Sequence, residues 1–276
     1  MEINSPENIP AGRGRMDMAK LKRAGAVTLP SLFTLTNMAF GFFAILSASD
    51  KEFSRAGWFI MGAIVMDMLD GRIARLVKGE SSFGVEIDSL SDWISFGIAP
   101  SYIMYQFLLK DYGFWGYPVA FLYTMCGALR LARFNIIAHA GESSKQYFQG
   151  LPIPGAAGIL ASFVLAYSML ETDSPGRSLR IVMSNMPVIY GLIPFIMIGL
   201  SVLMVSNVPF AAFKQNYFIR PSSLGGILLI MFTLFLIIAY PQNSLFLFFT
   251  AYVAMGLIVW LWKVFAGIRK EISPGR

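Results

Sequence analysis

The chain has 276 residues, of which 56% are hydrophobic and only 14% are charged, whereas a soluble domain carries about 25% charged residues. This composition excludes an ordinary soluble enzyme and favours an integral membrane protein. We interpret the net charge of +6 as membrane topology, because Lys and Arg stay on the cytoplasmic side of a membrane, and we expect no nucleic-acid partner.

The predicted elements begin with a polar and basic segment, residues 1–29. We expect it to be cytoplasmic, with 16–26 either an interfacial helix on anionic lipid or an ordinary basic flank. Apolar runs of about 17 to 25 residues follow, which is the length that crosses a bilayer. Their apolarity is continuous rather than alternating, so they predict helices and not a β-barrel. The eight predicted spans are 31–48, 56–77, 86–108, 114–138, 154–171, 187–207, 224–240 and 244–266.

The positive charges predict how these spans are oriented. With the N-terminus inside, 17 of the 22 Lys and Arg residues fall in cytoplasmic segments or in the inner half of the fourth span. The five on the outside are Lys51, Arg55, Lys110, Arg177 and Arg180. This asymmetry predicts an inner (cytoplasmic) membrane protein with both termini in the cytoplasm. The second and third spans then meet at a cytoplasmic hairpin.

Any metal site in this chain must be built from oxygen ligands. The chain has one cysteine, Cys126, and one histidine. A disulfide within the chain, a Cys- or His-rich metal site and a Ser-His-Asp triad are therefore excluded. Oxygen ligands favour hard cations such as Mg²⁺ or Mn²⁺ over zinc.

The predicted cytoplasmic hairpin contains the stretch "DMLDGRIARLVKGESSFGVEIDSLSD", residues 67–92. On a helix, Asp67 and Asp70 share one face, and so do Asp88 and Asp92. Burying several like charges together is unfavourable, so these carboxylates need cations, and one or two divalent ions would balance them. A pair of metal ions is also a known arrangement for phosphoryl transfer. We therefore predict that the four aspartates bind Mg²⁺ or Mn²⁺, as two ions.

Small residues and one arginine lie beside these aspartates. Gly71, Ala74 and Gly84 either leave room for a ligand or let the two helices approach closely. Arg75, one turn beyond Gly71, is placed to bind a phosphate. The alternatives are a structural set of Asp-Arg pairs and an ion pathway, as in a cation transporter or channel.

The spacing Asp-x2-Asp-Gly-x2-Ala-Arg-x8-Gly-x3-Asp-x3-Asp resembles the signature of the CDP-alcohol phosphatidyltransferase family at all eight fixed positions. The resemblance implies that Asp67, Asp70 and Asp88 bind divalent metal. It implies that Asp92 is the general base and could also touch a metal. The residues that it places around the CDP moiety and its phosphates are Gly71, Ala74, Arg75 and Gly84.

The same resemblance implies a domain organisation and partners. The family core has six transmembrane helices, so it would cover residues 30–207 as the catalytic membrane domain. Residues 208–276 would then be an additional transmembrane hairpin with a short cytoplasmic tail. The implied partners are CDP-diacylglycerol, an acceptor alcohol, membrane lipids and, because members are often dimers, a second copy of the chain.

Three other stretches, "TLPSLFTLTNMAFGFFAI", "LRLARFN" and "FQGLPIPGAAG", resemble the phosphatidylserine synthase branch of this family. That branch implies L-serine as the acceptor, with phosphatidylserine and CMP as products. Arg130 and Arg133, near the depth of the aspartates, need an anion: the serine carboxylate, a lipid phosphate, or a protein carboxylate or carbonyl. Asn135 could hydrogen-bond the amino acid, and Thr36 and Asn37 could contact the nucleotide or another helix. The alternatives within the family are acceptors such as glycerol 3-phosphate or inositol phosphate.

Overall fold

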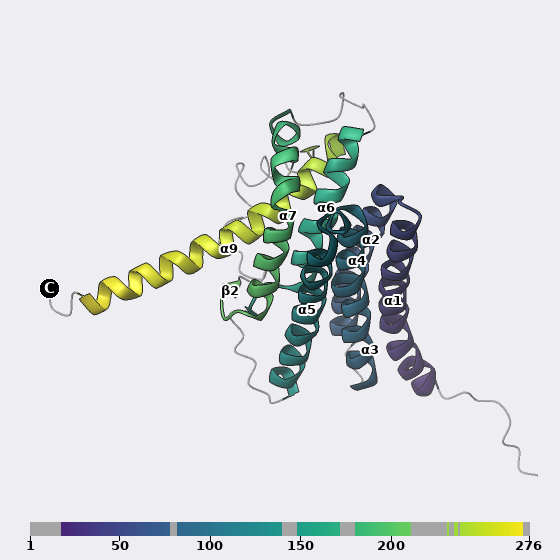
Figure 1. The fold of residues 1–276 in the computed structure, drawn as a ribbon. Helices are drawn as coiled ribbons and strands as arrows, with labels where there is room; N and C mark the ends of the chain where they lie inside the picture. Colours follow the sequence, from purple (N-terminus) through teal and green to yellow (C-terminus); the bar gives the residue numbers. More distant parts are fainter. Residues whose placement is uncertain are drawn as a thin grey trace, which may run out of the picture.

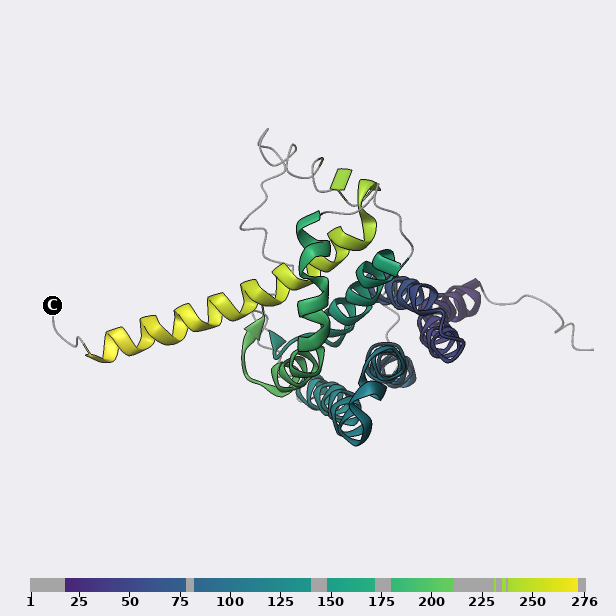
Figure 2. The same ribbon diagram turned by 45° about the horizontal axis from the view of Figure 1, so that its top comes forward.

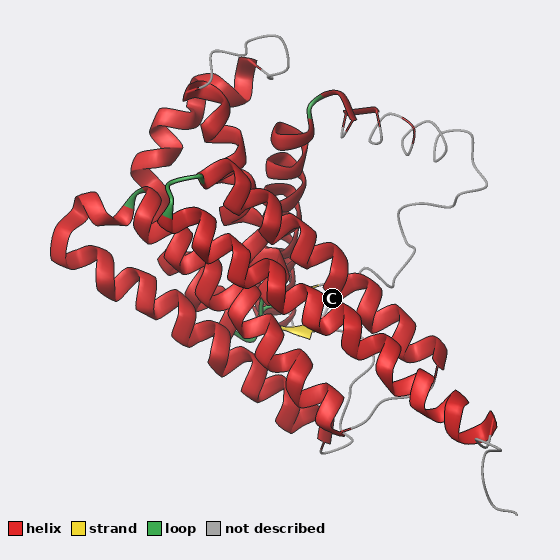
Figure 3. Ribbon diagram, turned by 90° about the vertical axis from the view of Figure 1, so that its right-hand side faces the viewer, coloured by secondary structure: helices red, strands yellow, loops and turns green. Residues whose placement is uncertain are grey.

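The computed structural model describes residues 18–77, 82–139, 148–171, 180–210, 231, 235–236 and 238–272, and its helices lie side by side in a bundle (Figure 1). The first half of the chain forms α1 (Met18–Ser49), α2 (Phe53–Val77), α3 (Ser82–Asp92), the π-helix η1 (Trp93–Ile98), α4 (Ala99–Phe107) and the 3₁₀ helix η2 (Leu109–Trp115). The second half forms α5 (Gly116–His139), β1 (Phe148–Gln149), α6 (Ile153–Glu171), α7 (Arg180–Val205), β2 (Pro209–Phe210) and α9 (Pro241–Ile272). Apart from the two short strands, the regular structure in the described ranges is helical (Figure 3), so the expected all-α fold is confirmed.

The helices occur where the apolar runs predict them, with two differences in detail. The first predicted span, 31–48, is the C-terminal part of a longer helix that starts at Met18. The third, 86–108, is a continuous rod in which α3, η1 and α4 follow one another, because Asp92 and Ile98 keep right-handed helical backbone angles at the junctions. Most of the predicted span 224–240 lies outside the described residues.

The outer surface of the bundle is apolar. Three helical stretches in the described ranges are long and apolar enough to cross a membrane: Leu32–Ser49, Ser184–Val205 and Pro241–Trp262. The apolar part of α6, Ile153–Met169, is shorter. On α7, Val188, Phe195 and Val202 follow one another at seven-residue intervals and are 64%, 70% and 60% exposed. They form an apolar stripe on one face of the helix, as expected of a surface in contact with lipid.

Small residues bring the helices of the core together. The most extensive contact is between α1 and α2, and α1 also meets α3, η1 and α4. Ala44 and Ala48 of α1 and Ala56 and Ala63 of α2 are fully buried. These small residues let neighbouring helices approach closely, which is the usual packing in a membrane.

A two-stranded antiparallel pair ties the chain before α6 to the chain after α7. Phe148 of β1 lies opposite Phe210 of β2. Gly150 then turns with φ of 82°, a conformation that favours glycine. A Cβ at this position would lie 2.4 Å from the carbonyl oxygen of Met204, so the turn and the close approach both require glycine.

The helix α9 crosses the bundle and continues beyond it (Figures 1 and 2). It packs on α6, where a Cβ on Gly158 would lie 2.3 Å from the Phe249 ring and one on Gly155 would lie 3.1 Å from the Tyr252 ring. The glycines of α6 thus form recesses for the aromatic residues of α9. With 32 residues, α9 is longer than the roughly 20 residues that cross a bilayer core.

Candidate active site

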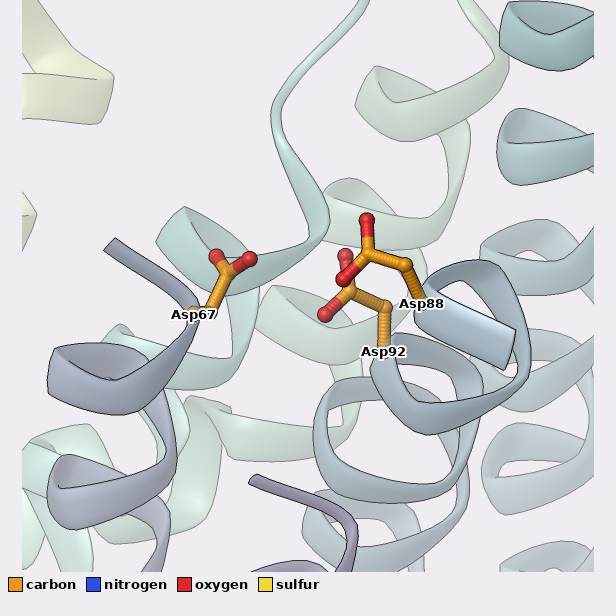
Figure 4. A group of neighbouring side chains, drawn as sticks. All are labelled: Asp67, Asp88 and Asp92. Atoms are coloured by element: carbon orange, nitrogen blue, oxygen red, sulfur yellow. The ribbon is translucent and has the colours of Figure 1, made fainter. Parts of the chain in front are cut away.

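Aspartates from two helices meet inside the bundle, where the second half of α2 approaches the C-terminal end of α3. Figure 4 shows Asp67 of α2 facing Asp88 and Asp92 of α3. One carboxylate oxygen from each of the three lies within 4.8 Å of the others. Asp88 and Asp92 are one helical turn apart, so both side chains project from the same face of α3 toward α2.

Asp70, the fourth aspartate, lies beside this group of three. It is only 6% exposed, and its Oδ2 accepts a hydrogen bond from the hydroxyl of Thr34 on α1. Its carboxyl group is also within hydrogen-bonding reach of Asp88. The structure therefore brings all four sequence-predicted aspartates together, with Asp67, Asp88 and Asp92 as the closest set.

The donor set of this cluster fits a divalent cation such as Mg²⁺ or Mn²⁺. The three converging groups are all carboxylates, which are the ligands that hard cations prefer. Oδ1 of Asp88 is buried and has no hydrogen-bond partner among the described residues. Such an atom is unfavourable unless something binds to it. Asp67, Asp88 and Asp92 would hold the ion, and Asp70 would adjoin them.

Hydrogen bonds from α1 reach two of the aspartates. Besides the bond from Thr34 to Asp70, Nδ2 of Asn37 donates to Oδ1 of Asp92 at 3.0 Å. The helix-to-helix hydrogen bond, one of the two alternatives for Asn37, is therefore present. Thr36 instead bonds the carbonyl of Leu32 in its own helix. Thr34 is not among the predicted site residues, since a threonine inside an apolar run carries no signal that an aspartate 36 residues away lies beside it.

The small residues of the signature differ in what surrounds them. A Cβ built on Gly71 would meet no atom of the described residues within 4 Å, so this glycine borders open space and does not serve close helix packing. Gly84 is half-buried on α3. Ala74 and Arg75 belong to α2, but their side chains lie outside the described part of the structure.

Of the two arginines of α5, Arg130 belongs to the aspartate cluster. Its guanidinium is close enough to Asp67 and Asp92 for the charges to interact. Its Nε is buried and has no hydrogen-bond partner among the described residues. In contrast, Arg133 donates from Nη2 to Oδ1 of Asn207 at 2.6 Å, beyond the end of α7.

Asn135 also points toward α3. Its Nδ2 donates to the hydroxyl of Ser89 at 2.9 Å, and Ser89 directly follows Asp88 in the chain. The end of α5 is thus fixed against the helix that carries two of the aspartates.

The fold and this site define an integral membrane protein with a buried acidic centre suited to a divalent cation and one arginine beside it. The sequence matches the CDP-alcohol phosphatidyltransferase family over residues 27–194, a range that includes all four aspartates and Arg130 and ends inside α7. The chain belongs to the CDP-alcohol phosphatidyltransferase family. The resemblance of its aspartate signature to that family is therefore confirmed.

Individual relatives are similar over most of the chain. The CDP-diacylglycerol–serine O-phosphatidyltransferase of Helicobacter pylori is 36% identical over 235 residues, which cover 84% of this chain and 90% of that protein. The protein of the same description from Bacillus subtilis is 32% identical over 188 residues, covering 68% and 92%. The archaetidylserine synthase of Methanothermobacter thermautotrophicus is 35% identical over 186 residues, covering 67% and 70%. The chain is thus an enzyme of phospholipid biosynthesis that acts on a CDP-linked substrate and an acceptor alcohol.

Proposed function

We propose that this enzyme transfers the phosphatidyl group of CDP-diacylglycerol to L-serine, giving phosphatidylserine and CMP. The observation that carries the acceptor is Arg130, a half-buried cation at the edge of an acidic cluster, whose buried Nε has no partner in the described structure. A buried guanidinium N–H without a partner suits a carboxylate ligand, because a carboxylate accepts hydrogen bonds from two N–H groups of a guanidinium. The relatives from Helicobacter pylori and Bacillus subtilis, both described as acting on serine, support the same choice.

The proposed reaction assigns one chemical role to each group of residues. Asp92 accepts the proton of the serine hydroxyl, because a hydroxyl is a poor nucleophile at neutral pH and needs a base within hydrogen-bond reach. The serine oxygen then forms a bond to the phosphorus that carries the diacylglycerol. The bond from that phosphorus to the oxygen of CMP breaks, and CMP leaves with the electron pair. When bound, the divalent cation supplies positive charge to the pyrophosphate and to the leaving group.

The CDP moiety is assigned to the open side of α2. Gly71 borders unfilled space, and the signature positions Ala74, Arg75 and Gly84 follow on the same hairpin. Arg75 would pair with a phosphate of the nucleotide, which is the anion that a guanidinium binds best. The lipid chains would stay in the bilayer beside the apolar outer surface of the helices.

We further propose that the active site faces the cytoplasm in an inner membrane that the chain crosses eight times. The supporting observation is the distribution of Lys and Arg along the sequence, because 17 of the 22 fall in cytoplasmic segments or in the inner half of the fourth span when the N-terminus is inside. Serine, metal and CMP would then exchange with the cytoplasm. CDP-diacylglycerol would enter from the inner leaflet.

Other acceptors fit the described site less well. Glycerol 3-phosphate and inositol phosphate each carry a phosphate and would need a cluster of basic side chains. Of the two arginines on α5, Arg133 is already bonded to Asn207, which leaves Arg130 as the nearby cation. A cation transporter, the alternative from a different class, does not agree with membership of a transferase family.

The test is CMP release by the purified enzyme with CDP-diacylglycerol and a panel of acceptors. Arg130→Ala should raise the KM for serine about 10- to 100-fold, since a charge-assisted hydrogen bond to a ligand contributes about 1.5 to 3 kcal/mol. The KM for CDP-diacylglycerol should change much less. Serinamide, which lacks the carboxylate, should be a poor substrate of the wild type, and Arg130→Ala should discriminate little between serinamide and serine.

Arg133→Ala is the matched control, because it removes the same side chain one turn along α5. Its KM for serine should stay near that of the wild type. A serine KM that is unchanged in Arg130→Ala would reject this arginine as the carboxylate site. Equal turnover of serine and glycerol 3-phosphate by the wild type would reject serine as the acceptor and leave the family activity intact.

A further inference from the structure

Two residues of α1 each make the same pair of contacts with the helices that carry the aspartates. Thr34 donates from its side chain to Asp70, and its carbonyl oxygen accepts a hydrogen bond from the hydroxyl of Ser91 at 2.9 Å. Three residues later, Asn37 donates from its side chain to Asp92 at 3.0 Å. Its carbonyl oxygen accepts a hydrogen bond from the hydroxyl of Ser95 at 2.8 Å. The bond from a serine hydroxyl to a carbonyl of α1 thus repeats after one helical turn on both sides of the contact, while the two side-chain bonds end on α2 and on α3.

Helix α1 is held at a fixed distance and register against α3 and η1 at this point. A Cβ built on Gly41, one turn beyond Asn37, would lie 2.4 Å from the hydroxyl oxygen of Ser95 and 2.7 Å from its Cα. Only glycine permits this approach. Because Thr34, Asn37, Ser91 and Ser95 are all buried, the four hydrogen bonds are shielded from water. Three of them hold α1 in one position along α3 and η1, and the fourth joins α1 to α2.

The side chain of Asn37 is poorly explained by stability alone. It is fully buried, yet its Oδ1 has no hydrogen-bond partner among the described residues. A buried carbonyl oxygen without a partner destabilises the folded state. The amide cannot be reversed, since its oxygen would then face the carboxylate oxygen of Asp92. What the residue supplies is one N–H donor, directed at one oxygen of Asp92.

We propose that Asn37 and Thr34 are positioning residues, which orient the carboxylates of Asp92 and Asp70 so that their remaining oxygens are presented to the cation and to the acceptor hydroxyl. With Oδ1 of Asp92 occupied by the amide, the other oxygen is left for the site. Thr34 in the same way holds Asp70 against Asp88. A carboxylate without such a donor can rotate about the Cβ–Cγ bond, and it then loses the geometry that metal binding or proton transfer needs. The part concerning the acceptor hydroxyl rests on the proposed function, whereas the part concerning the cation does not.

The test measures Mn²⁺ binding by electron paramagnetic resonance in purified protein without substrate, together with kcat. Asn37→Leu and Thr34→Val should each weaken Mn²⁺ binding or lower kcat about 10- to 100-fold, the usual effect of losing a partner of a metal ligand. Thr34→Ser keeps the hydroxyl and should restore both values. Asn37→Asp keeps the shape without the donor and should not.

Two matched controls separate positioning from a general effect of the substitution. Thr36→Val makes the same change two residues from Thr34, where the hydroxyl bonds only its own helix. Asn243→Leu replaces another fully buried asparagine, in α9, whose amide atoms have no partner in the described structure. Both should bind Mn²⁺ and turn over like the wild type.

The thermal midpoint of the metal-free protein is the third measurement. It should be similar in Asn37→Leu and in the wild type, because the substitution removes one unpartnered oxygen as well as one hydrogen bond. If leucine prevents folding, Asn37→Ala takes its place. Mn²⁺ binding and kcat equal to those of the controls in Asn37→Leu or Asn37→Ala would overturn the proposal. If the variants weaken Mn²⁺ binding as expected but the wild type does not use serine as the acceptor, the proposed function alone is rejected.

Discussion

At the scale of single residues, the buried carboxylate oxygen of Asp88 indicates that the acidic cluster is suited to bind a cation. Its Oδ1 is buried without a partner in the described structure, although Asp67 and Asp92 converge on the same space. Three carboxylates in that arrangement repel one another unless positive charge lies between them. The cluster is thus a place where a cation would stabilise the fold as well as serve the reaction.

We therefore expect Asp67→Asn, Asp88→Asn and Asp92→Asn each to lower activity by more than about 100-fold, because an amide is a weak substitute for a carboxylate ligand. Mn²⁺ binding should weaken in parallel. EDTA should abolish activity, and added Mg²⁺ or Mn²⁺ should restore it. The control is Asp111→Asn, an exposed aspartate in η2. Full turnover in EDTA would reject the metal site.

The sequence was sufficient to predict these aspartates but not the residues that hold them. The spacing of Asp67, Asp70, Asp88 and Asp92 on two helices is local, so helical geometry alone places each pair on one face. The bonds from Thr34 and Asn37 join residues that are 36 and 55 positions apart. Which helix lies beside which depends on tertiary packing, and no periodicity in the sequence encodes it.

At the scale of secondary structure, the notable element is η1, the π-helix that begins directly after Asp92. The apolar run predicts one uniform helix here. A π-helix changes which carbonyls are available to neighbours, and α5 bonds η1 in both directions. The Tyr123 hydroxyl of α5 donates to the carbonyl of Phe96 at 3.2 Å, and Nε1 of Trp93 in η1 donates to the carbonyl of Thr124 on α5 at 3.2 Å. The irregularity depends on a partner helix, so the sequence of this span alone could not predict it.

We expect Tyr123→Phe to destabilise the protein by about 1 to 3 kcal/mol, because it leaves the buried carbonyl of Phe96 without its donor. Tyr123 is fully buried, so water cannot replace the hydroxyl. Activity should fall several-fold, because η1 directly follows Asp92 in the chain. Thermal unfolding in detergent and CMP release are the measurements.

Tyr117→Phe provides the comparison for this variant, because it removes a hydroxyl from the same helix where the side chain is 60% exposed. It should leave both stability and activity near those of the wild type. If the two variants proved equally stable and active, the carbonyl of Phe96 would not need its partner.

At the scale of the whole molecule, the bundle places an acidic cluster between helices whose outer surface is apolar. Composition and run length were sufficient to predict helices and a membrane location, because both follow from how apolar residues partition. The number of membrane crossings stays a prediction. So does any dimer, since the structure contains a single chain. The division into a catalytic domain, 30–207, and an additional hairpin, 208–276, stays a prediction as well, and what the structure describes there is chiefly α9, which packs on α6.

The proposed orientation predicts that the two ends of α2 are on opposite sides of the membrane. In a Cys126→Ala background, Glu80→Cys should react with an impermeant maleimide only from the cytoplasm, and Asp50→Cys only from outside. Asp50 is exposed in the connection between α1 and α2, and removing the buried Cys126 leaves one thiol in each variant. Labelling of both positions from the same side would disprove the arrangement.

The two aspartates of α2 also have a consequence for how the protein is inserted into the membrane. Among the described helices, α1 qualifies as a membrane span by its own apolarity, whereas α2 does not. An aspartate at the centre of a span opposes insertion by about 2.5 to 3.5 kcal/mol, and α2 carries Asp67 and Asp70. Only residues 50–52 connect α1 to α2, and α1 leaves the ribosome first. Insertion of α2 is therefore expected to require α1 to remain beside the translocon, so that the two helices enter the bilayer as one hairpin.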